Sequence, residues 1–144
     1  MNIVYQFNGY NFKDFGVYVS LGKGLIGKPK RKKPNIFEYP DESGYVADLK
    51  NEIYEPRIIE LFCFIKAATI NDLIDNYNSF TSELFSILET KQLQVNIGTK
   101  SLNFLVYVEN ISDLDKIISD GMNVGTFTVK LIEPDTSIYE KTNN

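Results

Sequence analysis

The chain changes its hydrophobic period once, near residue 69, and this change constrains the fold more than any other feature. Residues 57–65 read Arg-Ile-Ile-Glu-Leu-Phe-Cys-Phe-Ile, a run rich in the β-branched and aromatic side chains typical of a strand. From Ile70 onward, apolar residues recur at spacings of mostly three and four, which is the period of an amphipathic helix. The sequence therefore predicts one strong strand followed by one long helix over about residues 70–88.

The predicted helix has a start signal and one apolar face. Thr69 is placed to cap the first turn, and Asp72 stands three positions later, as in a capping box. We expect the apolar face to pack against a sheet as part of the core, while polar residues take the opposite face. The apolar positions are Ile70, Leu73, Ile74, Tyr77, Phe80, Leu84 and Leu88.

Strand signals lie on both sides of this helix. The Asn8-Gly9 step between aromatic residues predicts a tight hairpin, because both residues tolerate positive φ. In residues 124–132 the apolar side chains Phe127, Val129 and Leu131 fall on one face, and Glu133-Pro134-Asp135 ends that strand. Residues 111–118 are compatible with a short helix or a connection. Further strands are predicted at 15–19, at 36–39, and as a hairpin of 93–97 with 102–108 around a turn at 98–100.

These elements predict an α+β fold dominated by antiparallel sheet, arranged as a β-sandwich or as a curled sheet with the helix packed against it. The 144 residues fit one domain. We expect residues 1–135 to form that single β-rich domain and residues 136–144 to form a polar C-terminal tail. No stretch of about 20 apolar residues is present, so no membrane span is expected.

The most informative absence is histidine, which does not occur in the chain. Its absence removes the commonest general base and excludes Ser-His-Asp, Cys-His and histidine-containing zinc sites. Cys63 is the single cysteine, so neither an internal disulfide nor an all-cysteine zinc site is possible. We therefore expect a protein that is not an enzyme and holds no cofactor or metal.

Two segments carry weaker signals of chemistry. Residues 22–27 read G-x-G-x-x-G, but Pro29 and Pro34 follow, so no helix can open there as a dinucleotide site requires. We interpret this segment as part of a long loop. A carboxylate-dependent hydrolase remains an alternative, although the carboxylates stand among turn residues and are more typical of a solvated loop. They are Asp41, Glu42, Asp48, Glu52 and Glu55.

A basic cluster follows the glycine-containing segment, and it is the candidate partner-binding site. Five of the 15 basic residues lie in it, so ten basic residues remain against 19 acidic ones elsewhere. An acidic body with one basic loop favours docking onto an acidic neighbour, such as another copy of the chain. The alternative is a small nucleic-acid-binding module that uses loop 28–33. The cluster consists of Lys28, Lys30, Arg31, Lys32 and Lys33.

The order of these motifs resembles that of phage distal tail proteins (Dit). Residues 7–19 read F-N-G-x-x-F-x-D-F-G-V-Y-V, which looks like the start of that family. Residues 54–61 read Tyr-Glu-Pro-Arg-Ile-Ile-Glu-Leu and are similar to the family's x-x-R-x-I-x-L segment. The likeness covers about residues 7–135 and includes the basic loop 29–34, the turn at 41–44, the helix, the hairpin and the closing Glu-Pro-Asp at 133–135.

The resemblance implies a structural tail protein without catalytic residues. Members of the family have an N-terminal β-sandwich-like domain with one helix and assemble as hexameric rings between tail tube and baseplate hub. We therefore expect a homo-oligomeric ring, with tail-tube and hub proteins as partners and DNA passing through the lumen without specific binding. The expected location is the virion tail, of a phage or prophage, after synthesis in the host cytoplasm. Many members carry a second, carbohydrate-binding domain, and this chain stops near the point where it would begin.

Overall fold

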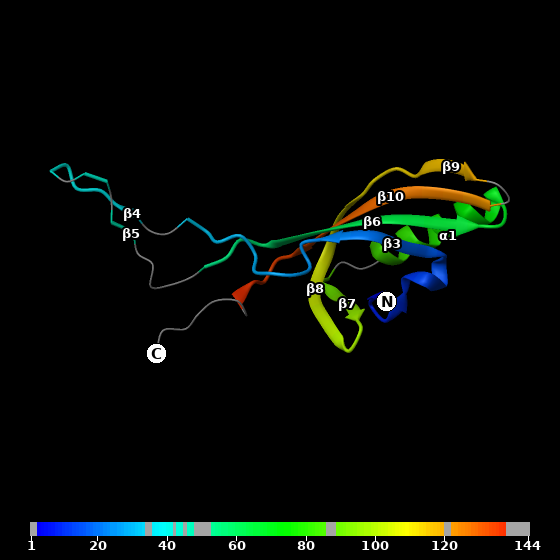
Figure 1. Cartoon of the computed structure of the whole chain (residues 1–144), viewed down its shortest axis with the longest axis horizontal. Helices are drawn as coiled ribbons and strands as arrows, with labels where there is room; N and C mark the ends of the chain where they lie inside the picture. The colour runs from blue at the N-terminus through cyan, green and yellow to red at the C-terminus, as the bar shows by residue number, and fades with distance from the viewer. Residues whose placement is uncertain are drawn as a thin grey trace.

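A computed structural model of the chain describes residues 3–33, 36–41, 43–44, 46–47, 53–85, 89–119 and 122–137. In these ranges, a strongly curled antiparallel sheet of eight strands holds one α-helix against its inner face, and a narrow arm projects from one end (Figure 1). The elements in chain order are β1 (Ile3–Phe7), β2 (Tyr10–Asn11), the 3₁₀ helix η1 (Phe12–Phe15), β3 (Val17–Lys23), β4 (Ile36–Phe37), β5 (Val46–Ala47), β6 (Arg57–Ala67), α1 (Ile70–Phe85), β7 (Lys91–Ile97), β8 (Lys100–Ile111), β9 (Asp115–Ser119) and β10 (Met122–Glu133).

The sheet runs in the order β2-β1-β7-β8-β10-β6-β3, and β9 also pairs with β10. Strand β8 makes the sheet curl, because its first part pairs with β7 and its last residues pair with β10. The register of β8 and β10 shifts between Lys130 and Leu131, as at a β-bulge, which bends a strand locally. The sheet does not close, so the structure has the curled form, and the sandwich alternative is not confirmed.

The longest pairing joins β6 and β10 and confirms two predicted strands. Their register runs without a break from Ala67 opposite Asn123 to Arg57 opposite Glu133. Along β6, buried and more exposed residues alternate, since successive side chains point to opposite faces of a sheet. On β10, the predicted inward residues Phe127, Val129 and Leu131 are all buried.

Helix α1 lies where the sequence predicts it, over Ile70–Phe85, and residues 86–88 lie outside the described residues. The hydroxyl of Thr69 accepts a hydrogen bond from the backbone N–H of Asp72 at 3.1 Å, so the predicted cap is confirmed. Leu73, Phe80 and Leu84 are buried. In the part of the chain that the structure describes, no helix is long and apolar enough to cross a membrane.

One side chain departs from the predicted helix face. Ile74 is predicted in the core but is 46% exposed, because it lies just outside the stripe that the curled sheet covers. Tyr77 is only partly buried, and its hydroxyl donates to the carbonyl of Ser112 at 2.9 Å. Phe80 is the centre of the core, with its ring edge-on to Phe12 at 5.0 Å between centroids.

The turns confirm both predicted hairpins. Asn8 and Gly9 have φ of 51° and 83° between β1 and β2, the left-handed conformation that an Asn-Gly hairpin uses. Strands β7 and β8 pair directly on either side of residues 98–99. By contrast, the predicted strand at 15–19 starts only at Val17, because Phe15 ends η1 and Gly16 caps it in the left-handed region. Residues 115–119 form β9, so the helical alternative for 111–118 is wrong.

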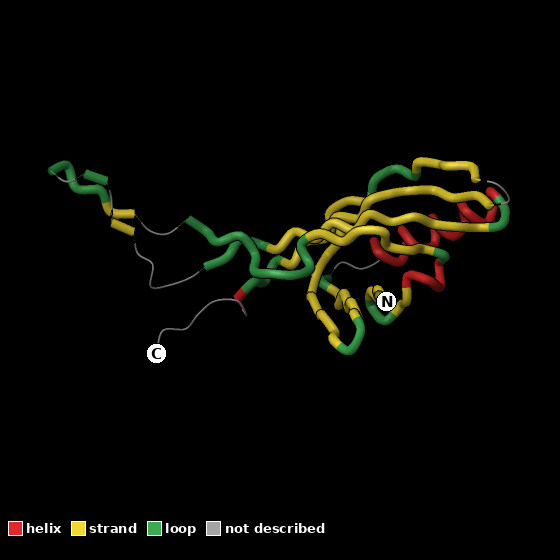
Figure 2. The backbone as a smooth tube through the Cα atoms, in the orientation of Figure 1, coloured by secondary structure: helices red, strands yellow, loops and turns green. Residues whose placement is uncertain are grey.

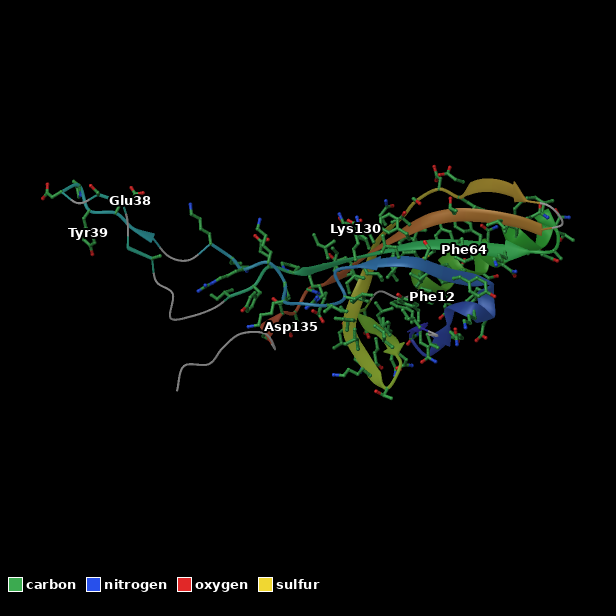
Figure 3. The ribbon with its side chains drawn as sticks, in the orientation of Figure 1. Phe12, Glu38, Tyr39, Phe64, Lys130 and Asp135 are labelled. Carbon is green, nitrogen blue, oxygen red and sulfur yellow. The ribbon has the colours of Figure 1, made fainter. Side chains whose placement is uncertain are left out.

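Residues 24–56 form the arm, whose described parts extend away from the body in line with β3 and β6 (Figures 1 and 2). Near the base of the arm, Arg31 and Tyr54 form an antiparallel bridge. Further out, β4 pairs with β5. Glu38 and Tyr39 lie near the far end, well separated from Phe12 and Phe64 in the body (Figure 3). The segment predicted as a long loop is thus one side of a two-stranded arm.

The packing of α1 predicts unequal effects for two aspartate substitutions. Leu84→Asp places an unpaired charge among core side chains and is expected to lower the free energy of unfolding by about 3–5 kcal/mol. Ile74→Asp, on the exposed side of the same helix, is the matched control and is expected to cost less than about 1 kcal/mol. Thermal unfolding followed by circular dichroism measures both. Equal melting temperatures for the two variants would show that the buried face is assigned wrongly.

Candidate assembly surface: a cationic arm, its anchor and two sheet edges

The five cations of the predicted site lie on one strand of the arm, and all are exposed. The backbone of this strand is held by the opposite one. The N–H of Lys32 donates to the carbonyl of Ile53, and the N–H of Glu55 donates to the carbonyl of Lys30, both at 2.7 Å. These hydrogen bonds fix the cations along one side of the arm. Lys28, Lys30, Arg31, Lys32 and Lys33 are all exposed within this short stretch.

Lys28 differs from the rest of the cluster because it contacts an aromatic residue of the arm base. Its Nζ donates to the hydroxyl of Tyr54 at 3.4 Å and lies 5.7 Å from the centre of that ring. Lys30, Arg31, Lys32 and Lys33 form no ion pair with a described carboxylate. Four like charges held in this way repel one another, so an acidic partner would be attracted to the arm.

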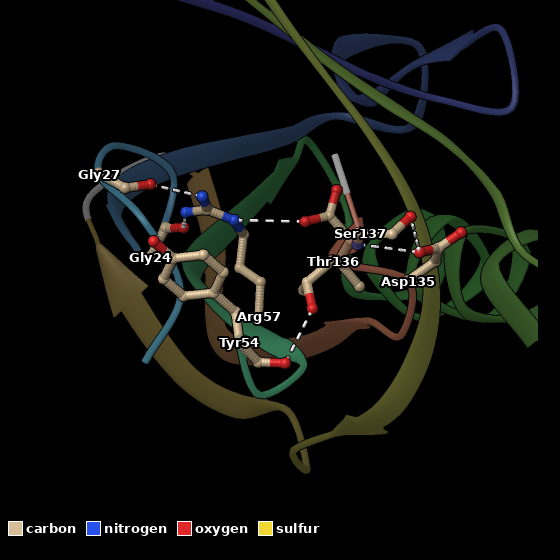
Figure 4. Close-up of polar contacts among 8 residues, drawn as sticks. Gly24, Gly27, Tyr54, Arg57, Asp135, Thr136 and Ser137 are labelled. Carbon is tan, nitrogen blue, oxygen red and sulfur yellow. Dashed lines mark hydrogen bonds and ion pairs between the residues drawn. The ribbon is translucent and has the colours of Figure 1, made fainter. Parts of the chain in front are cut away.

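The arm is anchored by a buried arginine, Arg57, the first residue of β6 (Figure 4). Its guanidinium donates to the carbonyl of Gly24 at 2.6 Å and to the carbonyl of Gly27. Its Nε lies 3.4 Å from a carboxylate oxygen of Glu133, and the guanidinium lies over the ring of Phe104, 5.3 Å from its centre. Arg57 and Glu133 are only 4% and 3% exposed. The arginine thus joins the body to the first turn of the arm.

The sequence alone did not identify Arg57 and Glu133 as a buried ion pair that anchors the arm. Arg57 begins the predicted strand, and Glu133 ends the last one, but they are 76 positions apart in the numbering. Only the register of β6 and β10, in which the two residues stand opposite each other, brings them together. A charged residue at the first position of a strand rich in apolar residues is the signal that could have suggested a buried pair.

A second contact ties the C-terminal segment to the arm base. The Thr136 hydroxyl donates to the carbonyl of Tyr54 at 3.0 Å (Figure 4). Thr136 and Tyr54 are buried, although the sequence places Thr136 at the start of the polar tail. Residues 138–144 lie outside the described residues.

The G-x-G-x-x-G segment serves as the turn that Arg57 holds. Gly24 has φ of 84°, and a Cβ there would lie 2.1 Å from the carbonyl oxygen of Ile58, so the close approach of two backbones requires glycine. Gly22 belongs to β3. The carbonyls of Gly24 and Gly27 point to a cation inside the protein, an arrangement opposite to the amide cradle of a phosphate loop.

The described residues form no constellation with enzymatic chemistry. Cys63 is buried, and desolvation raises the pKa of its thiol to about 12, so the nucleophilic thiolate is not formed near neutral pH. Of the acidic stretch, Asp41 is exposed and Glu55 half-buried, while Glu42, Asp48 and Glu52 lie outside the described residues. No group of three or more metal-ligating side chains occurs among the described residues.

Three strands of the described sheet pair on one side only. In the described ranges, β3 pairs only with β6, β9 only with β10, and the two-residue β2 only with β1. The two longer edge strands are β3 and β9. Every pairing from β3 through β6 and β10 to β9 is antiparallel. The two edge strands therefore run in opposite directions. Open edges present backbone N–H and C=O groups to any strand that approaches.

The buried pair of Arg57 and Glu133 predicts that replacing one residue costs much more stability than replacing both. Arg57→Met leaves Glu133 buried without its main cation and is expected to cost about 3–5 kcal/mol of stability. Replacing both residues, as Arg57→Met with Glu133→Leu, removes both charges and is expected to recover most of that loss. Chemical denaturation measures the stabilities, and hydrogen exchange of residues 24–31 should become faster in both variants. An Arg57→Met protein as stable as the parent would contradict the role of the pair.

Burial of Cys63 predicts that its thiol reacts only after unfolding. In the folded protein at pH 8, alkylation by iodoacetamide should be much slower than in denaturant, because the thiol is both inaccessible and protonated. Mass spectrometry of samples taken over time measures the modified fraction. Rapid alkylation of the folded chain would show that the thiol is accessible.

Comparison with known proteins gives one informative result. No protein-family model matches the sequence, and no curated protein matches it. Among solved structures, the chain is similar to SPP1 Dit (gp 19.1), described as a paradigm of the hub adsorption apparatus in phages that infect Gram-positive bacteria. The TM-score is 0.71 at 13% sequence identity, and the match covers 94% of this chain and 51% of that one. The chain thus has the fold of about half of SPP1 Dit.

Proposed function

We propose that this protein is a non-catalytic structural component of a phage tail, located at the distal end of the tail near the baseplate hub. The observation that carries the proposal is the fold shared with SPP1 Dit over 94% of the chain. Open sheet edges and an exposed cationic arm are features that serve assembly.

In this proposal, residues 1–135 form the ring-building domain, and copies join head to tail through their sheet edges. Because β3 and β9 run in opposite directions, β3 of one copy can pair antiparallel with β9 of the next when both copies have the same orientation. Such a contact joins two different surfaces, and it gives a ring without an unpaired end when the rotation between copies closes. The strands of adjacent copies then form one continuous wall around a lumen.

The number of copies and the content of the lumen follow from the family that the sequence resembles. We propose six copies, with DNA passing through the lumen without specific binding. The net charge of −4 is compatible with such a conduit, since a strongly cationic wall would retain phosphate groups. The assembled protein would reside in the virion tail after synthesis in the host cytoplasm.

The arm is proposed to bind partners outside the plane of the ring. It continues the direction of β3 and β6 (Figure 1), and strands in a closed wall tilt by about 35–45° from its axis. Its outer part therefore projects from one end of the ring, where the tail tube and the hub proteins would stack. The cluster of Lys28, Lys30, Arg31, Lys32 and Lys33 would contact acidic surfaces there.

Edge pairing predicts which backbone amides become protected on assembly. At about 100 µM to 1 mM protein, a range that reveals weak association, amides of β3 and β9 should exchange more slowly than in dilute solution. Hydrogen exchange read by mass spectrometry, with light scattering for the mass, measures both. The β7–β8 hairpin serves as the internal control, because its exchange should not depend on concentration.

Two outcomes would contradict the proposed function. One is a closed dimer in which the same surface of both copies is protected, because an isologous contact leaves no surface for a ring. The other is tight binding to duplex DNA that is abolished by neutralising the arm cations, which would favour the nucleic-acid-binding alternative. Strong dependence of such binding on salt would support that alternative further.

A further inference from the structure

A hollow of about 260 Å³ lies at the base of the arm and combines apolar and cationic side chains with one carboxylate, that of Glu55. Its apolar part includes Ile26 and Ile58, which are 82% and 51% exposed. Lys28 and Lys30 line it as well. Lys23, also exposed, precedes it directly at the end of β3. An amphipathic segment with carboxylates and aliphatic side chains is the ligand that matches this lining.

The chain carries such a segment where β8 passes into β9. Residues 109–115 read Glu-Asn-Ile-Ser-Asp-Leu-Asp and comprise the last residues of β8, the connection 112–114 and the first residue of β9. Glu109, Asp113 and Asp115 are exposed, whereas Ile111 and Leu114 are half-buried. Glu109 lies 3.4 Å from Lys130 of the same chain, but Asp113 and Asp115 form no ion pair with a described cation.

The register of the sheet places the hollow at the arm base and the segment 109–115 at the same height along the strands. Lys23 stands opposite Glu60, Glu60 stands opposite Lys130, and Lys130 stands opposite Asn110. Lys23 and Asn110 therefore lie on one line across these four strands. Lys23 is on the edge strand β3, and Asn110 is on the part of β8 that extends beyond its pairing with β7. When copies join edge to edge, the residues around Asn110 of one copy approach Lys23 and the hollow of the next.

We propose that the hollow at the arm base receives the acidic segment 109–115 of a neighbouring copy. This inference rests on the proposed edge pairing and names the side chains that fix its direction. Lys23, Lys28 and Lys30 would face Glu109, Asp113 and Asp115, while the aliphatic side chains of the segment cover Ile26 and Ile58. The contact is heterologous, because each copy offers the hollow on one side and the segment on the other.

Zero-length cross-linking tests the contact directly. A carbodiimide joins an amine to a carboxylate when the two groups touch, and a mixture of ¹⁴N- and ¹⁵N-labelled chains identifies links between copies. At about 1 mM protein, isotope-mixed peptides are expected to link Lys23, Lys28 or Lys30 to residues 109–115. Links between copies that involve only other residues, or no links at all, would overturn the proposal.

Charge reversal provides a second test with a matched control. Lys23→Glu with Lys30→Glu should weaken self-association about tenfold, since like charges would then meet across the contact. Asp113→Lys with Asp115→Lys should do the same, and the chain with all four substitutions should recover most of the loss. The control, Lys91→Glu with Lys100→Glu on the β7–β8 hairpin, makes the same change of charge and should leave association unchanged.

Sedimentation equilibrium at low salt measures the self-association of all these variants. Its outcomes separate the proposed edge pairing from the proposed contact between the hollow and the segment 109–115. If the parent associates with β3 and β9 protected but the charge reversals have no effect, this inference is wrong and edge pairing stands. If the four-substitution chain stays as weak as the double variants, the two surfaces do not meet. If the parent stays monomeric up to about 1 mM and yields no links between copies, neither proposal holds.

Discussion

The buried ion pair of Arg57 and Glu133 is the interaction on which the arrangement of body and arm depends. Removing two charges from water is costly, and the cost is offset only when the partners are fixed in good geometry with further hydrogen bonds. Here the arginine meets that condition by also binding the carbonyls of Gly24 and Gly27. One side chain thus ties the start of β6, the end of β10 and the first turn of the arm to one another.

The core supports this junction from the other end of the sheet. The aromatic rings of Phe12 and Phe127 each pack against Phe80 in a T-shaped, edge-to-face arrangement. One helix covers the inner face of a sheet that curls around it. Because α1 fills the inside of the curl, the end strands β2 and β3 do not have to pair with each other to enclose the core. The sheet therefore remains open, and strands with unpaired backbone groups are left at its edges.

An open edge is a liability for a soluble monomer and an advantage for a subunit. The same unpaired groups that would promote aggregation allow copies to continue one another's sheet if they meet in a defined direction. In the proposed contact, charge would supply this direction, because the cationic arm base of one copy would meet the acidic segment 109–115 of the next. At 13% identity, the likeness to SPP1 Dit is one of fold.

The sequence by itself determined the local elements of this protein. The run at 57–65, the three-and-four spacing after Thr69 and the Asn8-Gly9 step each specify their structure through near neighbours, so helix, hairpins and central strands could be predicted. It also placed the five arm cations in one cluster, since they are consecutive or nearly so. Their role in binding a partner stays a prediction.

Only the tertiary structure decided which distant segments meet. Residues 111–118 have no clear period, and 115–118 became part of a strand because β10 offered an edge to pair with. Ile74 fits the helical pattern as well as Leu73 does, but the curvature of the sheet covers one and leaves the other in solvent. Arg57 and Glu133 became a pair through the register of two strands. Pairing between distant segments depends on the packing of the whole chain, and no local pattern of residues encodes it.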